Sequence, residues 1–593
     1  MLKLTYVPLI WVLGHNMKTE FPLKKKIPTG VNNFHKLIRG NYLFCDKTLM
    51  LKEYLDKGEE VTLIVRPRRW GKTLNMSMFH HFFANEVYGN KTNELFLDLN
   101  IARVENGKYL EHQGKYPVIF VSFKDIKESS FEEALKKLKI LIRILYREHR
   151  YLLLTNQLEL DEKELFTDYL RGNLGKAELE DSIRYLSELL AKVHGKKVYI
   201  IIDEYDTPLN NSYEKYLEDM TRFMRNLFSA ALKGNEALER GILTGILRVS
   251  KDSMLSGLNN LTTYTLLDAP YKHHFGFSEA EVTNLFVESG HLLNLKEVKK
   301  WYNGYKVYDL IAYNPWSIVA CLSNEGQIDL YWTESARNDL VKSTIVGSTS
   351  DVKSQLEILM QEGTISRRIN KQVTFDMLTD NETALWSLLL FTGYLTAESS
   401  SLDRSTGGHV CELRIPNLEV LTLYHQYVLE WFTNKLGGGE RKYKSFLDSL
   451  EQGNVKEFVN KMEDYLLETA SIFDVGGDKK GESFYHGFSL ALIASLQEKY
   501  YIRSNRESGL GRYDTLLIPK EKGNEQGIIL EFKHAKKDQK IMLIAEEALK
   551  QINDKLYETE FKSNKNIRRI LKIGIAFSKK SVASAHELIT LSQ

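Results

Sequence analysis

Three features are scarce in this chain of 593 residues, and each scarcity excludes a class of protein. The only cysteines, Cys45, Cys321 and Cys411, are too scattered for a metal cluster or a disulfide framework, so we expect a reducing, cytoplasmic environment. No apolar run approaches the roughly 20 residues of a membrane helix, and no membrane contact is expected. The net charge is only +2, so nucleic-acid contacts would have to come from local basic patches.

The length is too great for one hydrophobic core and predicts several domains. The first 16 residues are apolar, but no small-residue cleavage site follows them, and Met17 opens a segment typical of a protein start. We therefore interpret residues 1–20 as an N-terminal extension rather than a signal peptide. The run Gly437-Gly438-Gly439 is the best candidate for an interdomain linker, because glycine-rich segments are flexible.

A phosphate-binding loop is predicted after the apolar run Val61–Val65, which is typical of a buried parallel strand. Gly71 lets the backbone approach a phosphate, Lys72 reaches the β- and γ-oxygens, and Thr73 offers a hydroxyl to Mg²⁺ at the start of a helix. The pattern is incomplete, because Arg66 stands where the first glycine of G-x-x-x-x-G-K-[ST] would be. A G-K-T tripeptide alone also occurs by chance, so the prediction depends on a partner motif.

That partner is a second buried strand, Tyr199–Ile202, which runs directly into Asp203 and Glu204. In an open α/β sheet, ligands bind at the carboxyl ends of the strands. We expect Asp203 to hold Mg²⁺ and Glu204 to orient the attacking water. The alternative is a surface turn with two acids by chance.

A further strand, predicted at Arg240–Leu247, carries the polar residue Thr244 and is followed by Arg248. The order of strand, helix and polar-tipped strand matches the sensor element of the additional-strand class of P-loop ATPases. A single threonine or arginine at a strand end is commonly structural, and this alternative remains open for both residues.

A second constellation lies near the carboxyl terminus, where Asp514 sits in one predicted strand and Glu531 and Lys533 in the next. Side chains alternate along a strand, so Glu531 and Lys533 share one face. Two carboxylates on adjacent strands can meet at one Mg²⁺, and the lysine can then orient water or stabilise charge on a phosphate. This is the core pattern of a PD-(D/E)XK nuclease.

Taken together, the motifs resemble those of AAA-ATPase-like proteins that end in a PD-(D/E)XK nuclease domain. In that family an arginine also replaces the first glycine of the loop, and the resemblance implies nucleotide binding more firmly than hydrolysis. The segments that carry the resemblance are R-P-R-R-x-G-K-T-L-N (Arg66–Asn75), I-D-E-Y-D-x-P (Ile202–Pro208), T-G-I-L-R-V-S (Thr244–Ser250), S-G-L-N-N-L (Ser256–Leu261), W-Y-N-G-Y (Trp301–Tyr305), Y-N-P-W-S (Tyr313–Ser317) and W-T-E-S (Trp332–Ser335).

The resemblance adds Glu482 as a helix-borne acid of the nuclease site and Gln551, with Tyr557, as the glutamine-tyrosine element of RecB-like nucleases. Gln551 could equally be an amide on a helix surface. The predicted catalytic residues are Glu204, Glu482, Asp514, Glu531, Lys533 and Gln551; the metal ligands are Thr73, Asp203, Asp514 and Glu531; and the nucleotide-binding residues are Arg69, Trp70, Gly71, Lys72, Thr73, Asp203, Thr244 and Arg248.

We therefore predict an α/β protein with an AAA-like P-loop domain at 21–270, a helical or winged-helix-like lid at 271–345, a connecting region at 346–439 and a restriction-endonuclease-like domain at 440–593. The predicted function is a nucleotide-regulated, Mg²⁺-dependent nuclease with ATP as cofactor and nucleic acid, most simply DNA, as partner. Two alternatives stay open: a switch that binds nucleic acid or protein without cutting, and an ATP-driven motor. The resemblance also suggests prokaryotic defence or mobile elements, and homo-oligomers through the ATPase domain.

Overall fold

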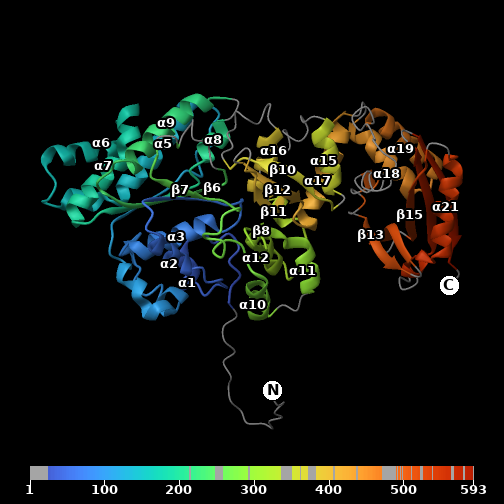
Figure 1. Cartoon of the computed structure of the whole chain (residues 1–593), viewed down its shortest axis with the longest axis horizontal. Helices are drawn as coiled ribbons and strands as arrows, with labels where there is room; N and C mark the ends of the chain where they lie inside the picture. The colour runs from blue at the N-terminus through green and yellow to red at the C-terminus, as the bar shows by residue number, and fades with distance from the viewer. Residues whose placement is uncertain are drawn as a thin grey trace, which may run out of the picture.

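The structure is a computed structural model of the whole chain (Figure 1). The N-terminal extension, Arg248 and Glu482 lie outside the residues that it describes. Among the described helices, none combines the length and apolarity needed to cross a membrane. The described residues are 25–212, 215–247, 255, 258–290, 294–334, 350–360, 362–371, 382–404, 408–435, 439–469, 489, 492–493, 496, 499–508, 511–520, 525–536, 539–561, 567–578 and 581–591.

The nucleotide domain is built on a parallel sheet of five strands in the order β4-β5-β6-β1-β7. Strand β6 separates the P-loop strand β1 from the acid-bearing strand β5, which confirms the predicted additional-strand topology. β1 and β5 are buried along their whole length, as their apolar sequences require. The strands are β1 (Val61–Val65), β4 (Val118–Ser122), β5 (Val198–Asp203), β6 (Leu238–Gly245) and β7 (Leu261–Tyr264).

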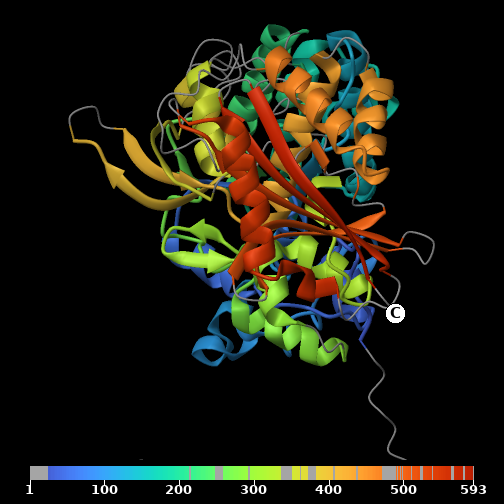
Figure 2. The same ribbon diagram turned by 90° about the vertical axis from the view of Figure 1, so that its right-hand side faces the viewer.

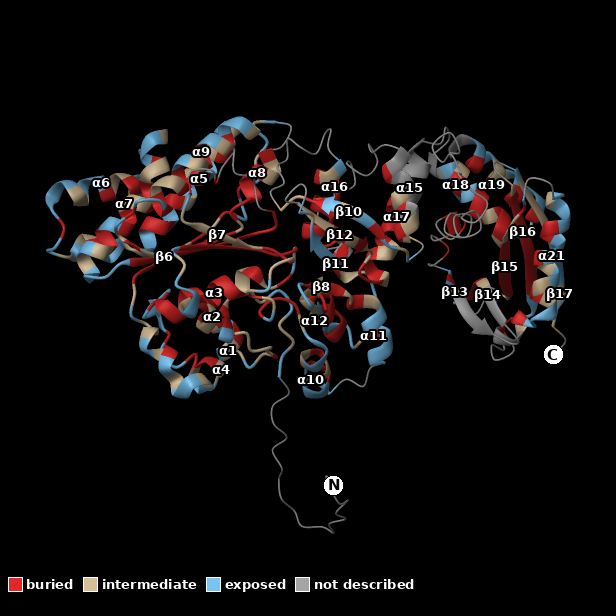
Figure 3. Ribbon diagram, in the orientation of Figure 1, coloured by how far each residue is buried: buried red, intermediate tan, exposed pale blue. Residues whose placement is uncertain are grey.

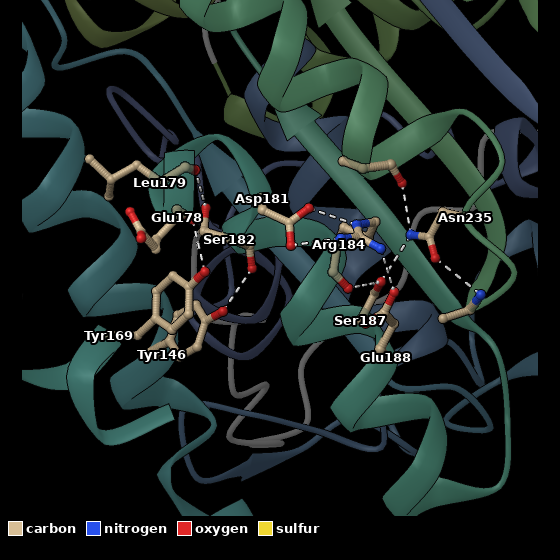
Figure 4. Close-up of polar contacts among 12 residues, drawn as sticks. Tyr146, Tyr169, Glu178, Leu179, Asp181, Ser182, Arg184, Ser187, Glu188 and Asn235 are labelled. Carbon is tan, nitrogen blue, oxygen red and sulfur yellow. Dashed lines mark hydrogen bonds and ion pairs between the residues drawn. The ribbon is translucent and has the colours of Figure 1, made fainter. Parts of the chain in front are cut away.

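Helices cover both faces of this sheet, and a helical layer is inserted between β4 and β5 (Figure 1). Residues 160–194 form two helices, because Gly172 ends the first in the left-handed conformation, with φ of 79°. Figure 4 shows how polar contacts join this layer: Tyr146 donates to the carbonyl of Ser182 at 2.8 Å, and Asn235 donates to Ser187 at 2.9 Å. The helices are α1 (Phe34–Arg39), α2 (Leu49–Lys57), α3 (Lys72–Phe83), α5 (Phe131–Glu148), α6 (Leu160–Arg171), α7 (Lys176–His194), α8 (Thr207–Ser212) and α9 (Leu217–Leu232).

The predicted lid contains helices and a β-hairpin with a small core of its own. Its elements are α10 (Glu279–Ser289), α11 (Leu295–Tyr302), β8 (Tyr305–Val307), β9 (Leu310–Ala312), α12 (Pro315–Ser323) and α13 (Tyr331–Glu334).

The connecting region forms a second layer against the nucleotide domain. Its antiparallel sheet β10-β12-β11 and its helices share one continuous hydrophobic core with that domain, to which Trp386 and Leu389 contribute. It is therefore part of the same packed unit and not a simple linker. The elements are α15 (Ser350–Met360), β10 (Ile365–Ile369), α16 (Glu382–Thr392), β11 (Thr396–Leu402), β12 (His409–Arg414) and α17 (Leu418–Lys435).

The C-terminal domain is a twisted sheet of five strands, β13 to β17 in sequence order, with helices on both faces (Figures 1 and 2). Only β15 and β16 pair in parallel, and α21 makes the crossover between them. β15 and β16 are largely buried, whereas β17 forms a more exposed edge (Figure 3). Strand β16 is therefore internal to the sheet. The elements are α18 (Gly439–Glu451), α19 (Val455–Thr469), β13 (Tyr500–Ser508), β14 (Gly511–Pro519), β15 (Gln526–His534), α21 (Ile541–Asp554), η5 (Tyr557–Phe561), β16 (Arg569–Ser578) and β17 (Ser581–Thr590).

Candidate functional site

The P-loop joins β1 to α3 and has a glycine where its backbone must turn. Gly71 precedes α3 with φ of 77°, a conformation that other residues rarely adopt, and a Cβ placed there would meet no atom within 4 Å. Lys72 follows and is buried, with its Nζ donating to the carbonyls of Arg66 at 3.2 Å and Pro67 at 2.8 Å. Burial lowers the pKa of Lys72, and the nearby acids, with Glu204 the largest contributor, oppose that shift.

Arg66, the residue that replaces the first glycine, anchors the loop instead of facing the cavity. It is completely buried, and its guanidinium donates to the carbonyls of Val65 at 2.8 Å, Tyr264 at 3.3 Å and Tyr271 at 3.4 Å. The guanidinium also lies 5.1 Å from the ring centre of Phe275. The departure from the usual motif is thus a tether from the P-loop to β7 and the chain that follows it.

The predicted magnesium ligands of this site lie together. Thr73 Oγ1 donates to Asp203 Oδ2 at 3.0 Å, and Ser122 Oγ donates to the same oxygen at 3.1 Å. The other oxygen, Asp203 Oδ1, is buried and has no hydrogen-bond partner in the described part of the chain. Burial, reinforced by Glu204, raises the pKa of Asp203 to about 6. An orphaned carboxylate oxygen beside a threonine hydroxyl is a donor set that fits Mg²⁺.

The residues around Asp203 differ in what they contact. Glu204 adopts φ of 50° and accepts a hydrogen bond from Thr207 Oγ1 at 3.0 Å. Thr244 is buried and donates to the carbonyl of Ile64 at 3.1 Å, so its hydroxyl joins β6 to β1. The sequence analysis gave no role to Asp206, although it belongs to the D-E-Y-D segment. Its Oδ2 accepts from the backbone N–H groups of Ile246 and Leu247, at 2.9 and 3.0 Å, and fixes the end of β6.

A cavity of about 580 Å³ opens over the P-loop, within the size range of small-molecule sites. The segment predicted as a lid supplies one wall, where the guanidinium carbon of Arg69 lies 4.2 Å from the ring centre of Trp316. Trp70 also lines the cavity but is 1% exposed, and its indole packs perpendicular to the ring of Tyr305, 5.4 Å away. The lining residues include Asn32, Lys47, Arg68, Gly71, Lys72, Thr73, Lys124, Lys127, Glu204, Phe277 and Pro315.

The second candidate site lies on the face of the C-terminal sheet that α21 covers. The backbone N–H of Asp514 donates to Glu531 Oε2 at 3.3 Å, and the N–H of Phe532 donates to Asp514 Oδ2 at 2.8 Å. Gln551 of α21 donates to Glu531 Oε1, and Gln551 Nε2 lies 3.4 Å from the hydroxyl of Tyr557. The structure thus brings together two carboxylates, an amide and a phenol that are far apart in the sequence.

Two further predicted residues of this site differ in placement. Lys533 is half-buried and lies two residues beyond Glu531 on the same strand, hence on the same face. Glu482 lies outside the described residues. Within the described ranges, no three His, Cys, Asp or Glu side chains gather closely enough to hold an ion. Asp514 and Glu531 each accept from a backbone N–H of the neighbouring strand, and two carboxylates on adjacent strands are compatible with a hydrated, oxygen-coordinated Mg²⁺.

Comparisons with known proteins match parts of both domains. A family model described as a predicted AAA-ATPase matches residues 28–255, and a model of the PD-(D/E)XK nuclease superfamily matches residues 480–587. An uncharacterized protein in the vnfD 5′ region of Azotobacter chroococcum mcd 1 is 24% identical over 412 residues, 68% of this chain and 70% of that protein. The solved Walker-type ATPase paby2304 of Pyrococcus abyssi has 15% identity and a TM-score of 0.34; the match covers 68% of this chain and 99% of that one.

Proposed function

We propose that this chain, which contains a predicted AAA-ATPase domain and a PD-(D/E)XK nuclease superfamily domain, is a nucleotide-regulated, Mg²⁺-dependent nuclease. In this proposal the P-loop domain binds ATP and controls phosphodiester hydrolysis at the C-terminal site. The substrate is nucleic acid, and DNA is the first one to test.

The nucleotide half of the proposal is supported by the P-loop geometry. The N-cap residue of α3, Gly71, has no side chain to cap the helix, and the N–H groups of a helix N-terminus suit a phosphate. Lys72, the first residue of α3, would contact phosphate oxygens. Thr73 and Asp203 would hold Mg²⁺, which neutralises charge on the β- and γ-phosphates when it is bound. Glu204 lines the same cavity and would orient a water molecule toward the γ-phosphate. Binding follows from these contacts more directly than turnover does.

The nuclease half depends on one observation, the direct contact of Asp514 with Glu531 on the sheet face that carries Lys533. Asp514 and Glu531 would hold Mg²⁺, which activates water and polarises the phosphoryl oxygen when it is bound. Gln551 fixes the orientation of the Glu531 carboxylate. Lys533 would place its ammonium beside the attacking water or the phosphate and stabilise the charge that develops there.

The proposal is tested by replacing Glu531 with glutamine, which keeps the shape of the side chain and removes its charge. We expect Glu531→Gln to lower Mg²⁺-dependent cleavage of plasmid DNA or oligonucleotides at least 100-fold, since a metal ligand is lost. Binding of a fluorescent ATP analogue should be unchanged. Glu587→Gln on the exposed strand β17 is the matched control and should cut normally. Wild-type activity in Glu531→Gln, or a wild-type chain that cuts no nucleic acid, would refute the nuclease assignment.

A further inference from the structure

A buried carboxylate far from the P-loop in sequence joins two of the motif segments that the proposed function leaves unexplained. Glu419, near the start of α17, is 0% exposed. Its Oε2 accepts from the hydroxyl of Ser317 on α12 at 2.8 Å, and its Oε1 accepts from the backbone N–H of Trp332 on α13 at 2.6 Å. One carboxylate therefore connects three helices.

Both of those lid helices contact the P-loop directly. The indole N–H of Trp332 donates to the carbonyl of Arg68 at 3.3 Å. Trp316, the neighbour of Ser317, stacks on Arg69, and its own indole N–H donates to the carbonyl of Tyr331 at 3.0 Å. The two tryptophans thus hold consecutive residues of the P-loop, and the bonds to Glu419 fix both of their helices.

The connecting region touches the same loop a second time. Gly393, just beyond α16, has φ of 93°, and a Cβ there would stand 3.1 Å from the Cβ of Pro67. Helix α17 extends from Leu418 to Lys435 and contacts α18, the first helix of the C-terminal domain. Helix α17 therefore carries, near its start, the carboxylate that holds the helices of Trp316 and Trp332. At its other end, the same helix reaches the nuclease-like domain.

We propose that Glu419 is a positioning residue for the nucleotide site, and that α17 is the element through which occupancy of the P-loop is communicated to the C-terminal domain. This inference rests on the proposed nucleotide binding. If α17 has two arrangements that differ in their affinity for nucleotide, nucleotide binding shifts α17 toward one of them by the same coupling free energy. The W-T-E-S and Y-N-P-W-S segments then have a common role, since Trp332, Trp316 and Ser317 together hold the P-loop; we call these three residues the clamp.

The test uses the full-length chain with Mg²⁺ and a fluorescent ATP analogue. Burial raises the pKa of Glu419 to about 7, and a glutamine in its place can still accept from Trp332 and donate to Ser317. We expect Glu419→Ala to weaken binding about tenfold or more, and Glu419→Gln to remain within about threefold of wild type. Trp332→Phe, which removes the indole N–H together with part of the ring volume, should weaken binding to an intermediate degree. Ser387→Ala, which removes a buried hydroxyl of the connecting region away from the clamp, is the matched control.

A second readout separates positioning from a merely structural effect. Hydrogen exchange of the α17 amides should slow when the analogue binds wild type or Glu419→Gln, and should not change for Glu419→Ala. Normal affinity in a folded Glu419→Ala, or in Trp332→Phe if Glu419→Ala does not fold, would overturn the inference while the proposed function stands. A wild-type chain that binds the analogue no better than Lys72→Ala would overturn the nucleotide site itself, and the inference with it.

Discussion

Replacing Arg66 with glycine restores the usual P-loop sequence pattern, but we expect the substitution to lower the stability of the folded protein. Burial lowers the pKa of Arg66 from 12.5 to about 10, so carrying its charge costs about 3 kcal/mol. Three hydrogen bonds to carbonyls, each worth about 1.5–3 kcal/mol for a charged donor, outweigh that cost. Glycine would remove them and leave the carbonyls of Tyr264 and Tyr271 beside a void.

The expected net loss is about 3 kcal/mol, because the relieved charge burial offsets part of the lost bonding and packing. For the packed unit that the nucleotide domain forms with the connecting region, that loss corresponds to a fall of roughly 3–5 °C in the unfolding temperature. Thermal unfolding and binding of a fluorescent ATP analogue measure the two effects, and affinity should fall with stability. Arg66→Met keeps most of the volume without the charge and separates packing from hydrogen bonding. An Arg66→Gly protein that unfolds at the wild-type temperature and binds nucleotide more tightly would show that the tether has no such role.

Two further predictions concern packing and pH. In Gly574→Ala the new Cβ would stand 2.3 Å from the backbone N of Leu549 and 2.4 Å from the carbonyl of Ala545, so α21 must shift. We expect the substitution to destabilise the fold by about 1–3 kcal/mol and to slow cleavage. An unchanged unfolding temperature and an unchanged cleavage rate would contradict the close packing. His80 is buried against Phe120, and burial lowers its pKa to about 3, so the unfolded chain binds more protons than the folded one between pH 3 and 6.5. Stability should therefore fall as pH drops through that window, and unfolding temperatures measured across it should fall less steeply for His80→Gln than for wild type; equal slopes would argue against this titration.

The parts of the fold that the sequence predicts best are those with a strong local signal. β1 coincides with the predicted strand at Val61–Val65, because five consecutive apolar residues before a glycine-containing loop have few other interpretations. Asp514 and Glu531 likewise lie on adjacent, paired strands, as two apolar runs that carry acids 17 positions apart indicate, and the backbone N–H of Asp514 donates to Glu531. The sequence analysis did not find β7, whose residues Leu261–Tyr264 are all only partly buried and show no alternation of apolar and polar positions.

The remaining features depend on contacts that no local pattern reports. Glu419 and Trp332 are 87 positions apart, and the connecting region joins the nucleotide domain through packing that only the folded chain reveals. Strand β17 was not predicted because it is polar and exposed, as an edge strand often is. The role of Arg66 could not be inferred either, since its three acceptors are backbone carbonyls, which the sequence does not distinguish.

The way in which Lys72 is held has a consequence for recognition. Its ammonium is buried and donates hydrogen bonds to two carbonyls of its own loop in the absence of a ligand. A phosphate that binds here as proposed would exchange one set of acceptors for another and would not have to dehydrate the ammonium. The desolvation of this charge is completed during folding, so selectivity at the loop depends on whether a ligand's oxygens are better acceptors than a pair of peptide oxygens.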